Sequence, residues 1–364
     1  MTHSCETHAY ETHRAQIEAI LRAWNMAPEG AATTADILAY ADLCGIDSHG
    51  LSMLPPYDKL RRAGLLNIEA RPAVTRETPV SAIVDAGGGL GHPAGRLAMQ
   101  TAIAKAKSIG MASVVVRNTA HYGACGYYTK MAADAGLIGM STTTTPGITV
   151  APTGGAQGRL GTDPWSMAAP GAVGAPFLLD MATATVASGK VRNKANEKLP
   201  VPPGWVMSKD SQPSTDPLDL LERHGFLTSL GGTPEGAAHK GYGLAAMARI
   251  LSAGLAGAPM LLAPELASRP PTGSLAHFFF AMDPGLFRDA EEFRADVAAF
   301  CDSLRATRPV DPSRPVQVAG DPERANAARR MREGIPVAPG LMAQVKALAE
   351  ASGAQWLLGG EASR

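Results

Sequence analysis

Residues 45–50 read Gly-Ile-Asp-Ser-His-Gly and follow a stretch, residues 33–44, that is patterned as a helix. Apolar residues in that stretch recur at intervals near 3.6, the repeat of an α-helix. Gly45 is expected to end the helix, as a glycine beyond a helix C-terminus commonly does. The turn that follows therefore places the hydroxyl of Ser48 beside the imidazole of His49, between two glycines.

This turn has two interpretations. A histidine beside a serine hydroxyl suits reversible proton transfer, because imidazole titrates near neutral pH. Alternatively, Asp47 and Ser48 cap the next helix and His49 is an incidental surface residue. The rest of the chain has to decide between a catalytic turn and a structural one.

The composition is that of a globular protein that handles a small molecule. The 364 residues, 45% hydrophobic and 18% charged, can bury a sizeable core and suggest two domains. Lysine and arginine number 33, as do aspartate and glutamate, so no net field recruits nucleic acid or an anionic membrane. We find no signal peptide and no apolar run of membrane-spanning length, and we expect a soluble cytoplasmic protein.

Disulfide and metal chemistry are disfavoured. The four cysteines are widely separated and form no C-x-x-C pair, which argues against a disulfide framework and against a cysteine zinc site. The nine histidines show no H-E-x-x-H spacing, so a zinc hydrolase is poorly supported and we expect no metal.

The two ends of the chain are patterned as helices and the centre holds most of the strands, which predicts an α+β fold. Helices are predicted over residues 10–30, 33–44, 51–64, 95–108, 123–135, 240–256, from 290, 321–333 and 340–352. Strands are predicted near residues 74, 80–84, 113–116, 137–142, 166–169, 176–181, 276–282 and 316–318. The polar, proline-laden residues 190–217 are interpreted as a long surface excursion.

A glycine-rich segment, residues 87–95, lies between a predicted strand and a predicted helix and invites a dinucleotide-fold interpretation. Its spacing is G-x-G-x-x-x-G rather than G-x-G-x-x-G, and Asp85 precedes the segment instead of ending the next strand. Later segments do not continue a regular strand–helix alternation. A Rossmann-type dehydrogenase is therefore a weak alternative.

Several segments together resemble the malate/L-lactate dehydrogenase family, which is distinct from the Rossmann-type lactate and malate dehydrogenases. That family includes ureidoglycolate and sulfolactate dehydrogenases, diketogulonate reductase and Δ1-piperideine-2-carboxylate reductases. The matching segments occur in the family's order and cover nearly the whole chain: residues 45–50, 118–128, 160–170, 179–190, 240–245, 277–284 and 320–339.

The resemblance implies a fold beyond what the patterns reach. It implies a discontinuous helical domain, residues 1–75 and 288–364, and a sheet-based cofactor-binding domain, residues 76–287. The sheet is expected to be large, mixed and mainly antiparallel, and to bind NAD or NADP without a Rossmann unit. The family also implies a homodimer with active sites near the subunit boundary. The glycines at 87–95 then serve a tight turn rather than a pyrophosphate cradle.

The implied reaction moves a hydride between nicotinamide and the alpha carbon of a 2-oxo or 2-hydroxy carboxylic acid. Negative charge grows on the carbonyl oxygen, so a positioned acid must supply a proton. By resemblance this acid is His49, with Ser48 either orienting it or touching the substrate. His121 is the proton acceptor in some relatives; alternatively it packs in the core or bonds to the loop backbone. Asp180 either holds a histidine tautomer, contacts the nicotinamide ribose, or caps the next turn.

The resemblance also assigns cofactor-binding residues. Loop hydroxyls and N–H groups suit phosphate and ribose, a lysine at a helix start suits a phosphate, and a later glycine–aspartate pair borders the adenosine. The residues are Thr143, Thr145, Gly161, Thr162, Asp180, Met181, Ala182, Lys240, Gly241, Gly320 and Asp321.

The substrate pocket departs from the family pattern. Met53 stands where relatives acting on malate or lactate usually carry the arginine that binds the substrate carboxylate. We expect either that Arg192 or Lys59 replaces that arginine, or that the substrate is bulkier or less anionic near residue 53. Thr162 is also expected to border the substrate. Asp163 and Trp165 also depart from the family pattern. The alternatives are therefore a reductase of a cyclic imino acid and a catalytically silent nicotinamide-binding protein.

Overall fold

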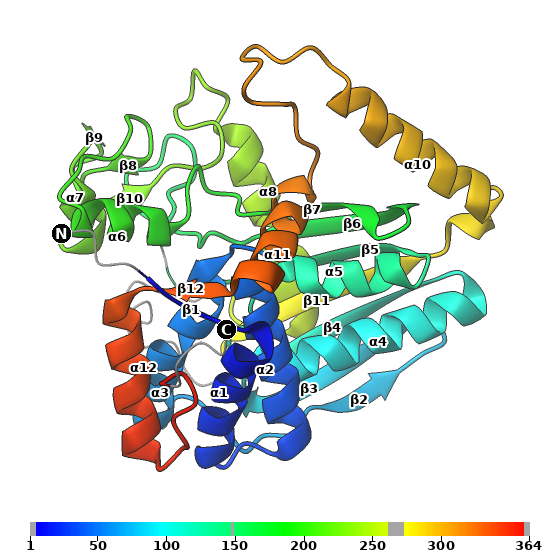
Figure 1. The fold of residues 1–364 in the computed structure, drawn as a ribbon. Coiled ribbons are helices and arrows are strands. Elements are labelled where there is room, and N and C mark those ends of the chain that lie inside the picture. The colour runs from blue at the N-terminus through cyan, green and yellow to red at the C-terminus, as the bar shows by residue number, and fades with distance from the viewer. Residues whose placement is uncertain (1–4, 146, 148, 261–272, 360–364) are drawn as a thin grey trace.

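The structure is a computed structural model that describes residues 5–145, 147, 149–260 and 273–359 (Figure 1). One part is helical and is assembled from both ends of the chain, whose short strands β1 and β12 pair antiparallel. Its elements are β1 (Glu6–His8), α1 (Tyr10–Ala23), α2 (Pro28–Leu43), η1 (Asp47–His49), η2 (Leu51–Met53), α3 (Leu54–Arg62), α11 (Asp321–Glu333), β12 (Ile335–Val337) and α12 (Pro339–Ser352).

The second part is a seven-stranded sheet with the order β2-β3-β4-β11-β5-β6-β7. Only β3 and β4 pair in parallel, and the other five pairings are antiparallel. The expected mixed, mainly antiparallel sheet is therefore confirmed. Its strands are β2 (Ala73–Glu77), β3 (Ser81–Gly89), β4 (Met111–Thr119), β5 (Ile138–Thr143), β6 (Trp165–Ala172), β7 (Ala175–Met181) and β11 (Leu275–Met282).

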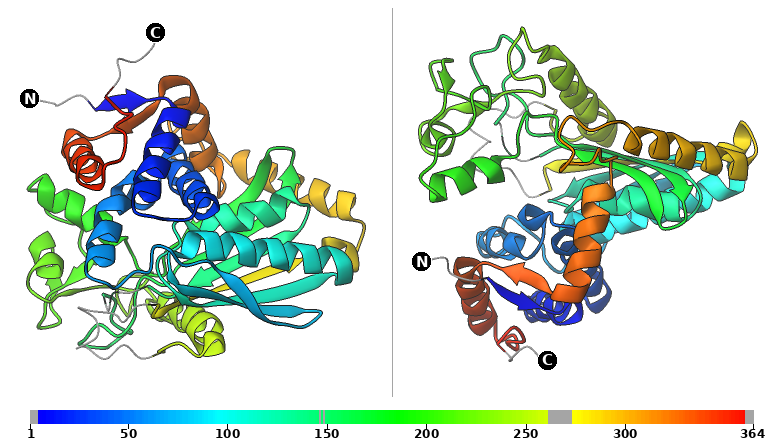
Figure 2. Two further views of the ribbon diagram at one scale, coloured as in Figure 1. Left: turned by 90° about the horizontal axis from the view of Figure 1, so that it is seen from below. Right: turned by 45° about the horizontal axis from the view of Figure 1, so that its top comes forward.

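Helices cover both faces of this sheet (Figure 2). On one face lie α4 (Gly91–Ile109) and α5 (Cys125–Asp134), and on the other lie α8 (His239–Arg249), the π-helical η3 (Ile250–Gly254) and α10 (Ala290–Arg305). Helix α4 approaches the strands closely because buried alanines recur every four residues on its inner face, at Ala94, Ala98, Ala102 and Ala106. The proposed domain division stays a prediction; α10, beyond residue 288, packs on β6 and β7.

The prediction of a surface excursion at residues 190–217 is wrong in part, because this segment belongs to a small lobe with its own core. This core combines residues of the segment with residues before and after the segment in the sequence, and a local pattern does not reveal such a combination. The lobe contains α6 (Ser188–Asn196), α7 (Pro217–Leu221) and a sheet of β8 (Val206–Met207), β9 (Pro213–Ser214) and β10 (Phe226–Leu227). Its buried core includes Val150, Leu160, Val186, Val191, Val201, Val206 and Leu227.

Three element boundaries also differ from the prediction. Helix α1 ends at Ala23, because Asn25 takes a positive φ of 68° and turns the chain before α2 begins. No strand forms at 316–318; the backbone N–H of Val318 instead donates to the Asp321 carboxylate at the start of α11 (2.8 Å). The predicted helix at 240–256 is α8 continued by η3.

The glycine-rich segment does not form a dinucleotide fold. It joins β3 to α4, but the strands beyond this one parallel pair run antiparallel. Gly87 and Gly88 take positive φ values, as a tight turn requires. A Cβ atom at Gly91 would lie 2.6 Å from the His277 ring, and one at Gly95 would lie 2.8 Å from the Tyr128 ring. The glycines therefore serve turning and close packing.

The turn at residues 45–50 is held between α2 and α11. The buried carboxylate of Asp42 accepts a hydrogen bond from the Leu51 backbone N–H (2.7 Å). Arg330, itself only 6% exposed, donates to the carbonyl oxygen of Asp42 and pairs with the Asp47 carboxylate. Helix α11, from the C-terminal part of the chain, thus fixes a turn in the N-terminal part.

We predict that Gly50→Ala destabilises the protein. A Cβ atom there would lie 2.0 Å from the carboxyl carbon of Asp42, and the bonds to that carboxylate prevent it from moving aside. We expect a loss of at least about 3 kcal/mol in the free energy of unfolding, measured by urea denaturation. The control is Gly340→Ala in α12, where a Cβ atom meets nothing within 4 Å, and should be neutral or slightly stabilising. Equal midpoints for Gly50→Ala and the wild type would contradict the prediction.

Candidate functional site

Three residues predicted from the sequence lie together beside the turn. The Ser48 hydroxyl is 2.8 Å from Nδ1 of His49, and the His49 and His121 rings lie 5.4 Å apart, centroid to centroid. His49 is half-buried in η1, and burial lowers the pKa of its imidazole below the ordinary value. Nε2 of His49 has no hydrogen-bond partner in the described part of the chain. It is therefore free to exchange a proton.

His121 is anchored more firmly than His49. It lies between β4 and α5, and its Nδ1 meets the hydroxyl of Tyr57 at 2.6 Å and the backbone N–H of Gly123 at 3.3 Å. Burial and the neighbouring histidines hold the pKa of His121 well below its usual value. Two imidazoles this close do not both carry a charge. The first proton therefore goes to His49, because its pKa is lowered less than that of His121.

Two further histidines lie deeper and were not found by sequence reasoning. His92 and His277 are fully buried, and burial lowers the pKa of each to about 3. His277 stacks on Tyr122 (4.1 Å) and bonds to Thr143 Oγ1 through Nδ1 (2.6 Å). Neither nitrogen of His92 has a hydrogen-bond partner. In the sequence, His92 lies in the glycine-rich segment and His277 begins one of the family segments. Neither position indicates that the residue is a neighbour of His121.

Asp180 lies at the end of β7 and reaches the start of α5. Its Oδ2 accepts a hydrogen bond from the Gly126 backbone N–H (2.7 Å), and we find no histidine bonded to it among the described residues. Burial is the largest cause that raises the pKa of Asp180, to about 6. The carboxyl group thus caps α5, and among the described residues its other oxygen receives no hydrogen bond.

The loop between β5 and β6 is organised by a buried ion pair. Asp163 and Arg249 are 0% and 4% exposed, and Arg249 Nε donates to Asp163 Oδ2 at 2.8 Å. The same carboxylate accepts bonds from the backbone N–H groups of Thr145 and Gly161. At Gly161 a Cβ atom would lie 1.8 Å from the Thr145 hydroxyl, so only glycine fits. Asp163 therefore shapes this loop from within.

This arrangement changes the interpretation of the loop. The N–H groups of Thr145 and Gly161 bond to Asp163, and that of Thr162 bonds to Thr145 Oγ1 (3.0 Å), so they are not free for a phosphate. Trp165 also has a structural partner, because its indole N–H donates to the Leu244 carbonyl in α8 (2.9 Å). The departures at positions 163 and 165 are thus explained by packing against α8.

Most of the proposed cofactor-binding residues nevertheless form one connected region at the end of β7. Thr183, which follows Met181 and Ala182, bonds to the Thr162 carbonyl through both its N–H (2.9 Å) and its hydroxyl (3.0 Å). Its own carbonyl accepts from the Leu230 N–H (2.8 Å). Gly241 packs on Leu230 so closely that a Cβ atom would lie 2.4 Å from its nitrogen. Thr143 is the exception, because its hydroxyl is turned toward His277.

The remaining cofactor residues differ in how free their side chains are. Lys240 is exposed at the start of α8 and makes no ion pair within the described residues. Gly320 lies beside Leu178 of β7, with a positive φ of 94°. Asp321 is occupied by Arg305 (2.9 Å) and Arg324, which lower the pKa of its carboxyl far below the usual value. Its negative charge is therefore balanced.

The two substrate-side candidates lie in different elements. Met53 ends η2 and packs against the core of the helical part. Arg192 is exposed on α6, whose first turn approaches the turn at residues 45–50: a Cβ atom at Gly189 would lie 3.6 Å from Cβ of Ser48. Because residues three apart share a helix face, Arg192 lies on the face of α6 that carries Gly189.

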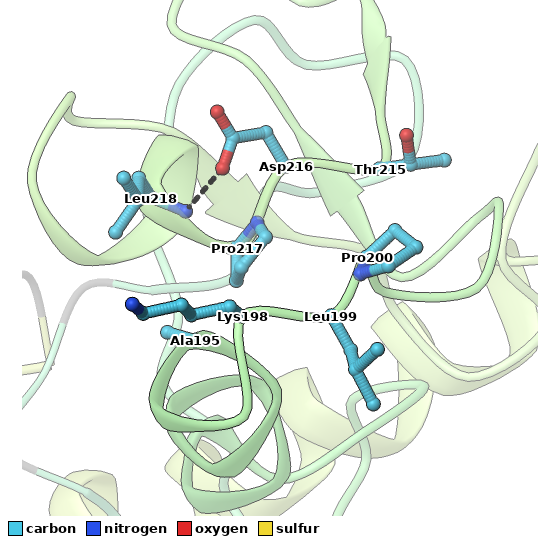
Figure 3. Close-up of a pocket in the computed structure, with 8 residues that line it drawn as sticks. All are labelled: Ala195, Lys198, Leu199, Pro200, Thr215, Asp216, Pro217 and Leu218. Atoms are coloured by element: carbon cyan, nitrogen blue, oxygen red, sulfur yellow. Dashed lines mark hydrogen bonds between the residues drawn. The ribbon is translucent and has the colours of Figure 1, made fainter.

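One surface pocket, of about 420 Å³, lies in the small lobe between the end of α6 and the start of α7 (Figure 3). Its polar group Asp216 is already used, since it caps α7 through the Leu218 N–H (3.0 Å) and pairs with Arg223 (2.8 Å). Within the described ranges we find no cluster of side chains placed to hold a metal ion, and no helix long and apolar enough to cross a membrane.

Comparison with known proteins identifies the class. A family model described as malate/L-lactate dehydrogenase matches residues 8–346, so the chain belongs to this family of hydroxy acid oxidoreductases. A malate dehydrogenase of Pyrococcus horikoshii is 34% identical over 330 residues, which are 90% of this chain and 91% of that protein.

Solved structures agree. The crystal structure of malate dehydrogenase from Entamoeba histolytica superposes with a TM-score of 0.91 at 30% identity and covers 97% of this chain and 99% of that one. The Δ1-piperideine-2-carboxylate reductase from Pseudomonas syringae pvar. tomato gives a TM-score of 0.83 at 28% identity and covers 94% of this chain and 100% of that one. The family resemblance inferred from the sequence is thereby confirmed.

We predict that Arg249→Met destabilises the protein by about 3–5 kcal/mol, because it leaves the Asp163 carboxylate buried without its counter-charge. Adding Asp163→Asn should recover much of that loss, since the amide is neutral and its oxygen still accepts the Thr145 N–H. Urea unfolding of the single and double variants measures both effects. A double variant no more stable than Arg249→Met would contradict this account.

We also predict a pH-dependent effect at Asp180. The pKa of its carboxyl is about 6 in the folded chain and about 3.9 when unfolded, so only the folded state keeps the proton between these values. The stability that this group contributes is therefore lost as the pH rises through about 6. Asp180→Asn removes the titration, and its stability relative to the wild type should rise by about 2 kcal/mol between about pH 4 and 7. A difference that stays constant over this range would refute the prediction.

Proposed function

We propose that this enzyme transfers a hydride between a nicotinamide cofactor and the alpha carbon of a 2-oxo or 2-hydroxy carboxylic acid, with His49 as the proton donor and acceptor. The observation that supports this best is the pair of adjacent imidazoles, in which His121 is anchored by Tyr57 and Gly123 while His49 has a free Nε2. An acid that must gain and lose a proton needs an accessible nitrogen and a pKa near the working pH.

The proposed steps are simple in the direction of reduction. A bound reduced cofactor, NADH or NADPH, would supply the hydride for the substrate carbonyl carbon. Protonated His49 donates its Nε2 proton to the carbonyl oxygen as negative charge develops there, and becomes neutral. Ser48 orients the ring through Nδ1. In oxidation, neutral His49 takes the hydroxyl proton back.

The residues at the end of β7 suit a nicotinamide cofactor. Asp180 has an oxygen without a protein donor, which can accept a bond from a ribose hydroxyl. The Thr162 hydroxyl has no protein partner among the described residues, and the exposed ammonium of Lys240 suits a phosphate. We therefore propose Asp180, Met181, Ala182, Thr162, Lys240 and Gly241 as the cofactor side of the site, with Gly320 beside them.

We propose that Arg192 binds the substrate carboxylate in place of the family arginine. Its helix begins next to Ser48, and it makes no ion pair with a described residue. Met53 favours a substrate with an apolar group next to it. The second candidate substrate is therefore a cyclic imino acid. The Pseudomonas relative is named as a reductase of such a compound, Δ1-piperideine-2-carboxylate.

We also propose a cytoplasmic homodimer. Four apolar side chains, each at least 39% exposed, follow one another along α8 and η3, which supports a surface that is covered in the assembled enzyme. They are Tyr242, Met247, Ile250 and Leu255.

The test is turnover of 2-oxo acids and cyclic imino acids with NADH and NADPH, followed by the absorbance of the reduced nicotinamide. His49→Ala should lower kcat by about 10²- to 10⁴-fold while cofactor binding persists. Because His49 must be neutral in oxidation and protonated in reduction, the wild-type oxidation rate should rise with pH through a pKa below about 6.5 and the reduction rate should fall.

The matched control is His224→Asn, an exposed histidine with a positive φ that asparagine tolerates. It should leave kcat unchanged. If turnover is the same in His49→Ala as in the wild type, the role of proton donor and acceptor would belong to His121 instead. Cofactor binding without turnover on any substrate would favour the silent binding protein instead.

A further inference from the structure

Tyr57 connects the helical part of the chain to the candidate site. It lies in α3, is 1% exposed, and brings its hydroxyl to 2.6 Å from Nδ1 of His121, which follows β4. A buried tyrosine hydroxyl needs a hydrogen-bond partner, and here the partner is a residue of the site rather than of the core. The contact therefore links the packing of α3 to the orientation of one imidazole.

The direction of this hydrogen bond follows from a second contact. The backbone N–H of Gly123 also points at Nδ1 of His121, at 3.3 Å, and an amide N–H can only donate. Nδ1 must therefore present its lone pair, and the Tyr57 hydroxyl donates to it as well. In neutral imidazole the proton then resides on Nε2.

The groups that face His121 from the packed elements are imidazoles and a phenol, and none of them carries a permanent charge. They are His49 of η1, Tyr57 of α3, His92 of α4 and His277 of β11, and no carboxylate among the described residues bonds to the ring. His92 lies 6.2 Å away, nearly perpendicular to the ring, and does not compete for Nδ1. Nε2 has no hydrogen-bond partner among the described residues, and His121 is partly exposed, whereas His92 is fully buried.

We propose that Tyr57 is a positioning residue that holds His121 as its neutral tautomer with the proton on Nε2. His121 then donates a hydrogen bond from Nε2 to the substrate oxygen, while His49 moves the proton. The hydrogen bond from His121 to the substrate rests on the proposed function. The tautomer of His121 is a property of the protein without substrate and can be tested separately.

The tautomer is measured by nitrogen NMR of the histidine rings in the full-length, ¹⁵N-labelled protein, with His121→Gln used to identify the signal. In the wild type His121 should show the tautomer protonated at Nε2. In Tyr57→Phe only the longer contact from the Gly123 N–H (3.3 Å) still favours a lone pair on Nδ1, so the signal should shift toward a mixture of the two tautomers. The control is Tyr40→Phe, whose hydroxyl pairs with Cys44 and not with the site, and which should leave the signal unchanged.

A second readout does not require a substitution. Replacing the tyrosines with 3-fluorotyrosine makes each phenol a stronger donor and should move the Nδ1 resonance of His121 further toward its hydrogen-bonded value. A His121 signal that is the same in Tyr57→Phe, or that does not respond to fluorination, would overturn the role of Tyr57.

Kinetics then separate this inference from the proposed function. Tyr57→Phe should lower kcat about tenfold or more, the effect of one neutral hydrogen bond, while the KM for the cofactor stays the same. A changed tautomer with an unchanged kcat would refute the donor role of His121. A changed tautomer in a protein that turns over no acid or imino acid would refute the proposed function and leave the role of Tyr57 supported.

Discussion

The structure depends above all on the pairing of Arg330 with the turn at residues 45–50. A guanidinium buried to this degree has to be paired, and Arg330 finds its partners in the Asp42 carbonyl and the Asp47 carboxylate, near the other end of the chain. Asp42 in turn accepts the N–H of Leu51 and leaves room only for glycine at position 50. The position of His49 is therefore decided jointly by both ends of the chain.

A second buried charge shapes the opposite side of the site. Asp163 meets Arg249 and also takes the N–H groups of Thr145 and Gly161, which ties the loop after β5 to α8. The two ion pairs act alike, because each fixes a loop that would otherwise have many conformations. Tyr57 adds a neutral connection, from the packed helix α3 to His121. These contacts orient His49 and His121, while Nε2 of each ring has no hydrogen-bond partner among the described residues.

How far the sequence predicts this arrangement depends on the range of the interactions involved. The apolar stripe of α1 and the β-branched run of β4 are local patterns, and both elements form, although α1 ends at Ala23, earlier than expected. The lobe around residues 190–217 was misread because Val201 and Val206 are buried by Val150 and Leu227, which lie far away along the chain. At the site, Ser48, His49 and His121 were found through family segments. Tyr57, His92 and His277 were not, since nothing in their spacing indicates a common neighbourhood.

By itself, the sequence determined the helix and strand periods, the balance of charge and, through the order of its motifs, the family. Those features reside in residues close together along the chain or in short segments that can be compared one by one. Only the tertiary structure decided that His49 lies beside His121, that the N–H groups of Thr145 and Gly161 are already bonded, and that Tyr57 reaches the ring of His121. The two contacts of His121 join distant segments, and even the local bond of Gly161 depends on an Asp163 carboxylate that is held by the distant Arg249. Such contacts exist only once the buried charges have found their partners and the core has closed around them.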